Sequence, residues 1–387
     1  MWREYLRSVA LSLLIALVLG AQVSPANHLD GVVRGGIAAG IYPGAVVVVG
    51  RSDSVLLARG YGHLTWSSSS PIPSPDSSLY DLASLTKVLA TAPAVMRLVE
   101  AGRLRLTDPV QQHLSEFAGP GKEAVTVAHL LSHTSGLRAF LPLNELAQDA
   151  ETARRLVFEE PLRWPPGRRV EYSDLNALLL GWIVERLSGQ PLDEFVSAEI
   201  FRPLGMSQTH FRPPRSAWPR TAPVGVWRGS PVAGTVHDQN AARFGGVAGH
   251  AGLFSTGQDL ARYAQFLLNQ GRGSDCRVVL QPVTVALFAR RWSGNRTLGF
   301  ELEDTTSADN SGVRLSAAAF GHTGFTGTSL WIDPERDLFV IMLTNRVYAP
   351  RASRSITRIK VLRGLVADAA AGLVDGGPSA AARVARC

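Results

Sequence analysis

Residues 44–50 (Gly-Ala-Val-Val-Val-Val-Gly) form an apolar, β-branched run that predicts a strand. A second β-rich stretch follows at 54–61, and Arg51-Ser52-Asp53 between them indicates the turn of a hairpin. Near the other end of the chain, 328–332 and 338–343 flank a turn in the same way. Because the two pairs come from opposite ends of the sequence, we expect one antiparallel sheet built from both ends.

The middle of the chain is predicted to be helical. From Ser84 to about Gly102 the pattern turns helical, and residues 103–225 carry further helical stretches, for example 125–131 and 176–187. A last helical pattern runs from about 355 to 371. The expected fold is therefore α+β: an antiparallel β-sheet flanked by helices, with a mostly helical inserted domain.

These patterns also give a domain division. Residues 27–102 and 226–372 are predicted to form the sheet domain, and 103–225 the helical domain. The Gly/Ala/Pro-rich end, 373–387, is predicted to be a flexible tail. Residues 1–26 are predicted to be a signal peptide rather than part of the fold.

The N-terminal segment has the parts of a secretory signal. Arg3 and Arg7 give it a positive start, Val9 to Leu19 is apolar apart from one serine, and Ser24-Pro25-Ala26 offers a cleavage site. The apolar run is short for a membrane span, which needs about 20 residues. We expect a periplasmic or secreted protein that starts near Asn27. An uncleaved N-terminal anchor is the competing interpretation, and the one case in which we expect membrane contact.

The composition is that of a globular protein. Of 387 residues, 45% are hydrophobic and 18% are charged, which excludes a disordered or fibrous chain. The net charge of +7 comes from scattered arginines, since Lys87, Lys122 and Lys360 are the only lysines. Without a basic cluster we expect no nucleic-acid partner. Cys276 and Cys387 are too few for a disulfide scaffold or a four-thiolate zinc site.

The first chemical motif is Ser84-Leu85-Thr86-Lys87 at the start of the first strong helix. Residues three apart share a helix face, and a lysine with a lowered pKa can remove the proton of a serine hydroxyl. Arginine cannot, because it stays protonated. In a chain with so few lysines, this spacing favours a titratable amine over a plain cation. The alternative is structural: Ser84 caps the helix and Lys87 is solvated.

Two further elements extend this motif. Tyr172-Ser173-Asp174 precedes a helical stretch, and a phenol close to an ammonium can act as a base or relay. Gly321-His322-Thr323-Gly324 lies at the edge of the late hairpin, where small residues let a substrate strand approach the backbone. The structural alternatives are a helix cap with a packed tyrosine, and a tight strand start with an exposed histidine.

The three elements, in this order, resemble the penicillin-recognising serine hydrolases, most closely the class C β-lactamases and the related D-alanyl-D-alanine carboxypeptidases and esterases. The family signature is Ser-x-x-Lys, Tyr-x-Asn and Lys/His-Thr-Gly, and the resemblance extends over roughly residues 28–370. Further stretches that look like family landmarks are 82–87, 130–137, 166–167, 201–206 and 249–255.

The resemblance implies a mechanism and a substrate class. Ser84 would be the acylated nucleophile, and Lys87 and Tyr172 would share the general-base and general-acid work. The expected protein is a secreted or periplasmic serine hydrolase acting on D-amino-acid peptides of cell-wall type or on small esters, with peptidoglycan as a possible partner. The alternative is a non-catalytic peptidoglycan- or β-lactam-binding protein with the same fold.

The resemblance also implies a substrate-binding strand. The backbone N–H groups of Ser84 and Phe325 would form the oxyanion hole. His322, Thr323 and Gly324 would line the strand that holds the carbonyl and carboxylate side of the substrate.

Asp174 departs from the signature, which has asparagine at this position. An ionised aspartate near Lys87 favours the ammonium form and opposes lysine as the base. Either Asp174 turns away as a helix cap, or it pairs with Lys87 and leaves Tyr172 to deprotonate Ser84. Asp174 disfavours the substrate-amide contact on which turnover of a β-lactam or a peptide depends. By analogy with the family, His322 in the third motif favours the carboxypeptidase or esterase branches over a dedicated β-lactamase.

No metal or cofactor is expected. His129 and His133 have helical i, i+4 spacing, but Leu130 stands where a zinc protease would carry its glutamate. We expect His133 to stabilise the turn that follows it. His237-Asp238 and His250 are interpreted as structural or cleft-lining. No serine has glycine at both −2 and +2, so the nucleophile elbow of α/β-hydrolases is absent.

Overall fold

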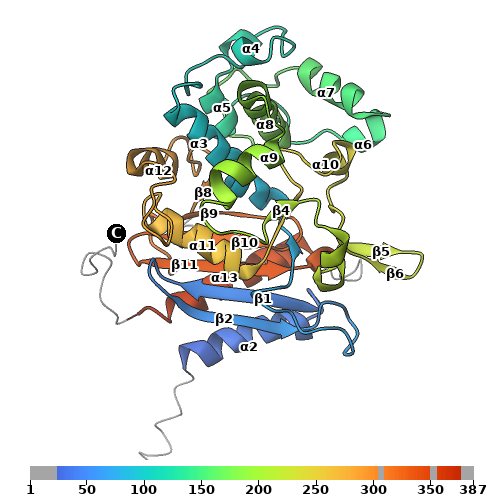
Figure 1. Ribbon diagram of the computed structural model, residues 1–387, viewed down its shortest axis with the longest axis vertical. Coiled ribbons are helices and arrows are strands. Elements are labelled where there is room, and N and C mark those ends of the chain that lie inside the picture. The colour runs from blue at the N-terminus through green and yellow to red at the C-terminus, as the bar shows by residue number, and fades with distance from the viewer. Residues whose placement is uncertain (1–23, 304–308, 349–354, 376–387) are drawn as a thin grey trace, which may run out of the picture.

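The computed structural model describes residues 24–303, 309–348 and 355–375. Its largest sheet lies at one end of the molecule and most of the helices at the other (Figure 1). The expected signal peptide (1–26) and tail (373–387) fall almost wholly outside the described residues and stay predictions. None of the described helices has the length and apolar character needed to cross a membrane.

The main sheet is antiparallel and uses both ends of the chain. Its strands are β1 (Gly44–Gly50), β2 (Val55–Gly62), β8 (Glu301–Leu302), β9 (Phe320–Thr323), β10 (Ser329–Asp333) and β11 (Leu338–Thr344). Their order across the sheet is β2-β1-β11-β10-β9-β8, so β1 pairs with β11 from the opposite end of the chain. Both predicted hairpins, β1–β2 and β10–β11, are confirmed.

Helices cover both faces of this sheet. They are α2 (Pro25–Ala38) and α13 (Ile356–Ala371) on one face and α11 (Gly257–Leu268) on the other. Successive strand side chains point to opposite faces. Val47 and Val49 therefore pack on the side of α2 and α13, while Val46 and Val48 pack on the side of α11. A strand covered on both faces needs apolar residues at every position, which explains the unbroken valine run.

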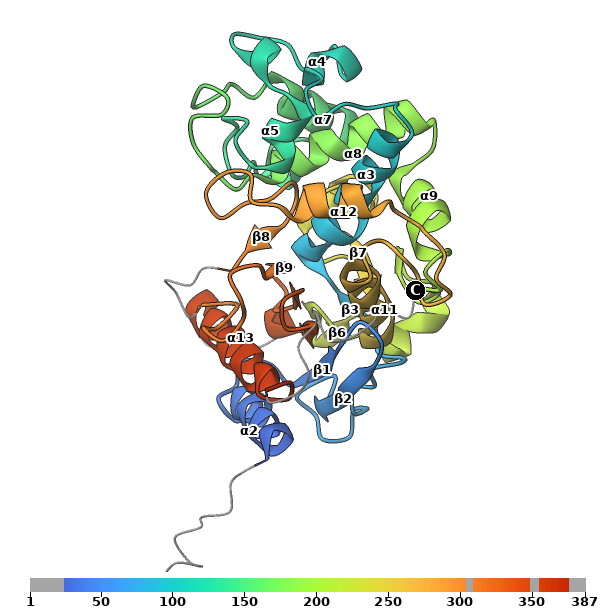
Figure 2. The same ribbon diagram turned by 90° about the vertical axis from the view of Figure 1, so that its left-hand side faces the viewer.

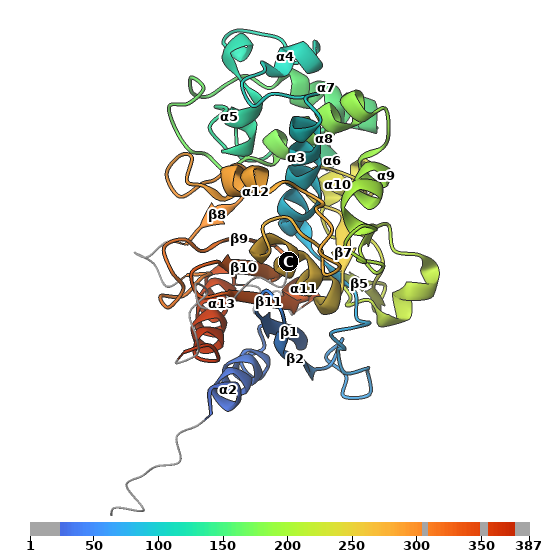
Figure 3. The same cartoon turned by 60° about the vertical axis from the view of Figure 1, so that its left-hand side comes forward.

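The other helices form the opposite end of the molecule, around the buried helix α8 (Figures 2 and 3). They are α3 (Ala92–Glu100), α4 (Val110–His113), α5 (Val127–Leu131), α6 (Leu143–Leu146), α7 (Ala150–Glu159), α8 (Asp174–Ser188), α9 (Leu192–Val196), α10 (Gln239–Arg243) and α12 (Pro282–Ala289). The predicted helical stretches at 125–131 and 176–187 are confirmed by α5 and α8. The proposed boundaries at 103 and 225 stay predictions.

The described residues also form two small sheets. Their strands are β3 (Tyr80–Asp81), β7 (Leu253–Ser255), β4 (His210–Phe211), β5 (Gly225–Trp227) and β6 (Ser230–Val232), in the orders β3-β7-β4 and β5-β6. Strand β3 pairs with β7 and leads directly into the turn that carries Ser84, so the candidate nucleophile lies between the main sheet and the helical end.

Candidate active site

Ser84 lies in a tight 3-10 turn, and the helix after it is not regular. The turn spans Ala83–Leu85, and a wider π-helical turn, Lys87–Thr91, leads on into α3. The helical stretch predicted from Ser84 is present, but its first two turns are 3-10 and π-helical. Ala83 has φ +47°, a sparsely populated value for a residue with a Cβ. The carboxylate of Asp81 holds this backbone by accepting the Ala83 N–H at 2.8 Å.

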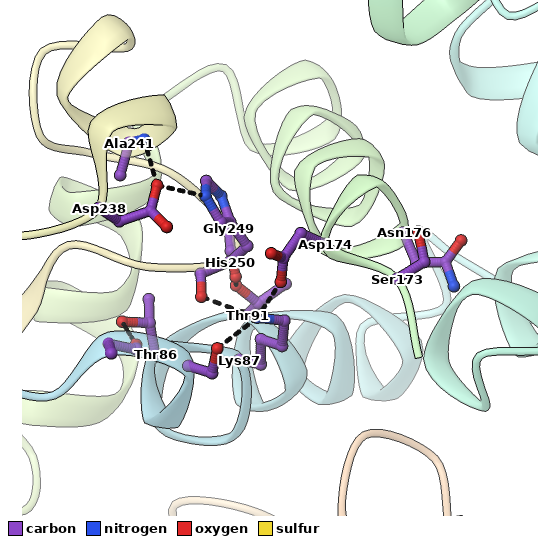
Figure 4. Close-up of polar contacts among 12 residues, drawn as sticks. Thr86, Lys87, Thr91, Ser173, Asp174, Asn176, Asp238, Ala241, Gly249 and His250 are labelled. Carbon is purple, nitrogen blue, oxygen red and sulfur yellow. Dashed lines mark hydrogen bonds and ion pairs between the residues drawn. The ribbon is translucent and has the colours of Figure 1, made fainter. Parts of the chain in front are cut away.

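Lys87 is buried, and its ammonium group contacts three oxygen atoms (Figure 4). Nζ lies 3.0 Å from Ser84 Oγ, 3.0 Å from the carbonyl oxygen of His250 and 2.8 Å from Asp174 Oδ1. An ammonium group has three donors and no acceptor, and each of these oxygens can act as an acceptor. Of the two expected arrangements of Asp174, the structure shows the pair with Lys87.

Tyr172 lies in the loop before α8 and is surrounded by basic side chains. Lys87 Nζ is 5.1 Å from the centroid of its ring, and the guanidinium carbon of Arg296 is 5.4 Å from it. The rings of His133 and His322 lie 4.7 Å and 5.8 Å from the tyrosine ring. The three motifs thus converge around Tyr172. No sequence pattern pointed to Arg296, which lies in a loop.

The charges of Lys87 and Tyr172 follow from burial and from each other. Burial lowers the pKa of Lys87, but the negative charge of Asp174 and the contact with Tyr172 outweigh it and leave the pKa above its ordinary value. Burial raises the pKa of Tyr172, and the neighbouring ammonium offsets this in part. At neutral pH, Lys87 is therefore an ammonium and Tyr172 a phenol.

His133 holds the loop that carries Tyr172. Its Nδ1 accepts the backbone N–H of Ser173 at 3.1 Å and lies 3.2 Å from Asn176 Nδ2, so this nitrogen is unprotonated. Burial, followed by the charge of Arg296, keeps the pKa of His133 well below its usual value. The turn role expected for His133 is present, because its φ is +56°, and its ring also fixes the residue that follows Tyr172.

His322 is a neutral acceptor rather than a cation. Its Nδ1 lies 2.8 Å from the carbonyl oxygen of Thr323, so Nδ1 carries the proton and donates it. Its Nε2 is buried and has no hydrogen-bond partner in the described part of the chain. Burial, then the charges of Arg296 and Lys87, hold the pKa of His322 well below its usual value. An unpaired acceptor therefore faces the site from β9.

Gly324 brings the end of β9 against the turn that carries the candidate nucleophile. A Cβ at this position would overlap the carbonyl oxygen of Leu82 and the hydroxyl of Thr328. The hydroxyl of Thr328 donates to Leu82 O at 3.1 Å, and that of Thr326 donates to Asp81 O at 2.7 Å. The loop after β9 is thus joined to the turn by side-chain hydrogen bonds.

Phe325 follows this glycine and is 56% exposed, with its ring stacked on His237 at 5.6 Å. Among the described residues, neither the backbone N–H of Phe325 nor that of Ser84 donates to an acceptor. Both groups are therefore available to a substrate oxygen.

The histidines considered as metal ligands are engaged in the protein. His129 Nδ1 accepts the N–H of Thr126, and His250 Nε2 lies 3.0 Å from the carboxylate of Asp238, which also caps α10. Within the described residues, no three His, Cys, Asp or Glu side chains are grouped to hold a metal ion.

The sequence was compared with known protein families and curated proteins. The family model described as Beta-lactamase matches residues 29–363. A protein of Salmonella agona named "Putative D-alanyl-D-alanine carboxypeptidase" is 31% identical over 385 residues, which cover 90% of this chain and 89% of that protein.

Solved structures share the fold. A penicillin-binding protein homologue from Caulobacter crescentus has a TM-score of 0.68 at 22% identity, covering 87% of this chain and 95% of that one. EstCE1, described as a hydrolase with promiscuous acyltransferase activity, has a TM-score of 0.71 at 23% identity, covering 89% and 98%. These similarities confirm the expected mixed fold with its antiparallel sheet.

Asp81 provides a pH test of the turn before Ser84. Burial raises the pKa of Asp81 to about 6, while the N–H groups of His237 and Ala83 act in the opposite direction. Between the unfolded value of about 4 and the folded value, the carboxyl is protonated in the folded chain and ionised in the unfolded chain. The free energy of unfolding therefore falls as pH rises from about 4 to about 6.

Replacing Asp81 by Asn removes this titration. We expect the free-energy difference between wild type and Asp81→Asn to change by about 2–3 kcal/mol between pH 4 and 6, and to stay level above pH 7. Urea unfolding at several pH values measures this free-energy difference, and Asp76→Asn, at an exposed position, is the control. If the free energies of unfolding of wild type and Asp81→Asn changed with pH in parallel, the raised pKa of Asp81 would be contradicted.

Proposed function

The chain belongs to the beta-lactamase family, and we propose that it is a serine hydrolase that forms an acyl-enzyme on Ser84 and acts on D-amino-acid peptides of cell-wall type. The observation that carries the proposal is the 3.0 Å contact between Lys87 Nζ and Ser84 Oγ, with the ring of Tyr172 beside it. A serine with a buried amine and a phenol at this range has what nucleophilic catalysis requires.

Tyr172 is the proposed base, because Lys87 is held as an ammonium and has no free electron pair. The phenolate form of Tyr172 takes the hydroxyl proton of Ser84 as its oxygen attacks the substrate carbonyl carbon. Tyr172 then gives that proton to the leaving nitrogen as the acyl-enzyme forms. In the hydrolysis of the acyl-enzyme, Tyr172 takes a proton from water as the water oxygen bonds to the acyl carbon. The bond from that carbon to Ser84 Oγ then breaks, and Tyr172 returns the proton to Ser84. Lys87 stabilises the phenolate throughout.

The edge of β9 supports a peptide substrate. Strand β8 pairs with β9 at Phe320 and Gly321, and His322 and Thr323 extend beyond that pairing. A substrate backbone can therefore continue the ladder as an added strand.

Arg296 supports a substrate with a free carboxylate. Its side chain is 11% exposed, its Nε and Nη1 have no hydrogen-bond partner in the described residues, and Glu301 is 3.8 Å away. A buried guanidinium with unused donors beside Tyr172 suits the carboxylate of a terminal D-amino acid. Small neutral esters are the second candidate substrates, favoured by the aspartate at position 174.

We also propose a periplasmic or secreted location, with peptidoglycan fragments as the partner. The support is the pattern of Arg3, Arg7 and the apolar run from Val9 to Leu19. Expression of the full chain followed by N-terminal sequencing of the exported protein tests the cleavage near Asn27.

The covalent step is tested by labelling with a fluorophosphonate. We expect an adduct on Ser84 in the wild type, no adduct in Ser84→Ala, and wild-type labelling in the exposed control Ser68→Ala. Turnover of a D-Ala-D-Ala peptide should fall by at least about 10³-fold in Ser84→Ala. Intact-mass spectrometry detects the adduct. Turnover of a chromogenic cephalosporin and of a nitrophenyl ester, measured beside the peptide, shows which substrate class is used. A wild type without adduct or turnover would favour the non-catalytic binding protein.

Asp174→Asn should shift the pH profile to lower pH. Asp174 raises the pKa of both Lys87 and Tyr172, so removing its charge lowers both and increases the fraction of base at pH 7. We expect the ascending limb of the kcat/KM profile, which reports the pKa of the base, to move to lower pH, and activity at pH 7 to rise about tenfold. The exposed variant Asp275→Asn is the control. Loss of activity in Asp174→Asn would instead make the carboxylate itself essential.

Arg296→Met should separate the two substrate classes. Loss of a charge-assisted hydrogen bond should raise KM for a peptide ending in D-Ala-D-Ala by about 10- to 100-fold. The amidated peptide and a neutral nitrophenyl ester should change little. Arg291→Met, an exposed arginine of the same loop, is the matched control. Equal losses on charged and neutral substrates would remove carboxylate binding from the role of Arg296.

A further inference from the structure

Two buried arginines contact the loop after β9. Arg363, on α13, donates from Nη2 to the carbonyl oxygen of Gly324 at 2.5 Å. Arg346 donates from Nε and Nη2 to the carbonyl oxygen of Phe325 at 3.2 Å and 2.5 Å. Arg363 is 3% exposed, and arginine is rarely buried to this extent without a specific contact. Its Nη1 lies 3.2 Å from Asn310 Oδ1.

The carbonyl that Arg363 contacts belongs to a particular peptide group. Gly324 C=O and Phe325 N–H are the two ends of one planar trans peptide, so they point in opposite directions. The backbone N–H of Gly327 also donates to this carbonyl, at 3.0 Å, so Arg363 and the turn at Gly327 together set the orientation of the N–H end. The guanidinium also polarises the peptide group, because hydrogen bonds in series strengthen one another. The N–H of Phe325 is one of the two groups proposed for the oxyanion hole.

The second proposed donor has a similar arrangement. The N–H of Ser84 shares its peptide group with the carbonyl of Ala83, and the hydroxyl of Thr86 donates to that carbonyl at 2.6 Å. Thr86 is fully buried. In both peptide groups, a buried side chain occupies the oxygen end while the N–H end has no acceptor in the described residues. The two peptide groups differ in one respect: Thr86 is neutral, whereas Arg363, which contacts the carbonyl of the Gly324–Phe325 peptide, carries a full positive charge.

We propose that Arg363 is a positioning residue of the oxyanion hole, which holds the Gly324–Phe325 peptide group with its N–H directed at the substrate oxygen and strengthens that N–H as a donor. The inference rests on the proposed acyl transfer at Ser84. Burial, and then the nearby Arg346, lower the pKa of Arg363 to about 9, so the guanidinium keeps its charge at neutral pH.

A merely structural role of Arg363 would have different consequences. If the side chain only anchored α13 to the sheet, its loss would lower stability and the active fraction, with each remaining active molecule working normally. If it positions the oxyanion hole, each correctly folded molecule is slower, because negative charge on the substrate oxygen develops only in the transition state.

The test compares an oxygen ester with its sulfur analogue. Kinetics are measured on an N-acyl-D-alanyl methyl ester and the matching thionoester, per active site titrated with fluorophosphonate. For Arg363→Met we expect kcat on the oxygen ester to fall by about 10- to 100-fold with KM within about threefold. The loss on the thionoester should be much smaller, because sulfur is a weak hydrogen-bond acceptor. Arg363→Lys should be intermediate, since it keeps the charge and loses the fork geometry.

Arg358→Met is the matched control, because it removes an exposed arginine from the same helix. It should leave both substrates unaffected. A second readout needs no turnover: the amide proton of Phe325, followed by NMR of protein labelled with ¹⁵N-phenylalanine, should move upfield in Arg363→Met and Arg363→Lys. Phe325→Leu assigns the signal.

Three results would overturn the inference: unchanged kcat per active site in both Arg363 variants, equal losses on ester and thionoester, or an unmoved Phe325 amide signal. Failure of the proposed function looks different. In that case the wild type shows no turnover that depends on Ser84, while the amide signal still reports on Arg363.

Discussion

The buried ammonium of Lys87 is the constraint on which the site depends. A charge in a protein interior is tolerated only when hydrogen bonds and an opposite charge compensate it. Its three acceptors come from three segments that are distant in sequence: the turn of Ser84, the first residue of α8 at Asp174, and the loop of His250. Satisfying this one group therefore joins the first motif, the helical end and the loop after α10.

The sheet supplies the frame that makes this convergence possible. Because β1 pairs with β11, the two ends of the chain form one rigid layer, and β9 is added to it through β10. Gly324 then lets the end of β9 approach the turn of Ser84 as closely as backbone atoms permit. From the other face, α13 reaches the same loop through Arg363. The loop after β9 thus links the packing of the two chain ends to the geometry of the site.

Local sequence patterns predicted the parts of this structure that depend on local physics. The β-branched valine run indicated a strand and the turn after it indicated a hairpin, and both predicted hairpins are present. The resemblance placed the three motifs in one site. In the structure the ring of Tyr172 lies beside Lys87 and His322, while the roles of these residues stay predictions. Periodicity could not reveal that the helix after Ser84 starts with a 3-10 and a π turn, because that depends on Asp81 and the strained Ala83. The roles proposed for Arg296 and Arg363 could not be predicted from the sequence either, because only the fold distinguishes these two residues from the many other arginines.

The charges around Tyr172 explain how Asp174, which departs from the family signature, and the histidine form of the third motif belong together. A lysine in the third motif would add a positive charge to the site, whereas His322 is neutral. Asp174 adds a negative charge at a position where the signature has a neutral asparagine. Taken alone, both changes make the site more negative and make an anionic substrate and a phenolate harder to hold. Arg296 lies 5.4 Å from the ring of Tyr172 and restores one positive charge at the point where both would need it. In this chain the guanidinium beside Tyr172 therefore comes from the loop of Arg296 and not from strand β9.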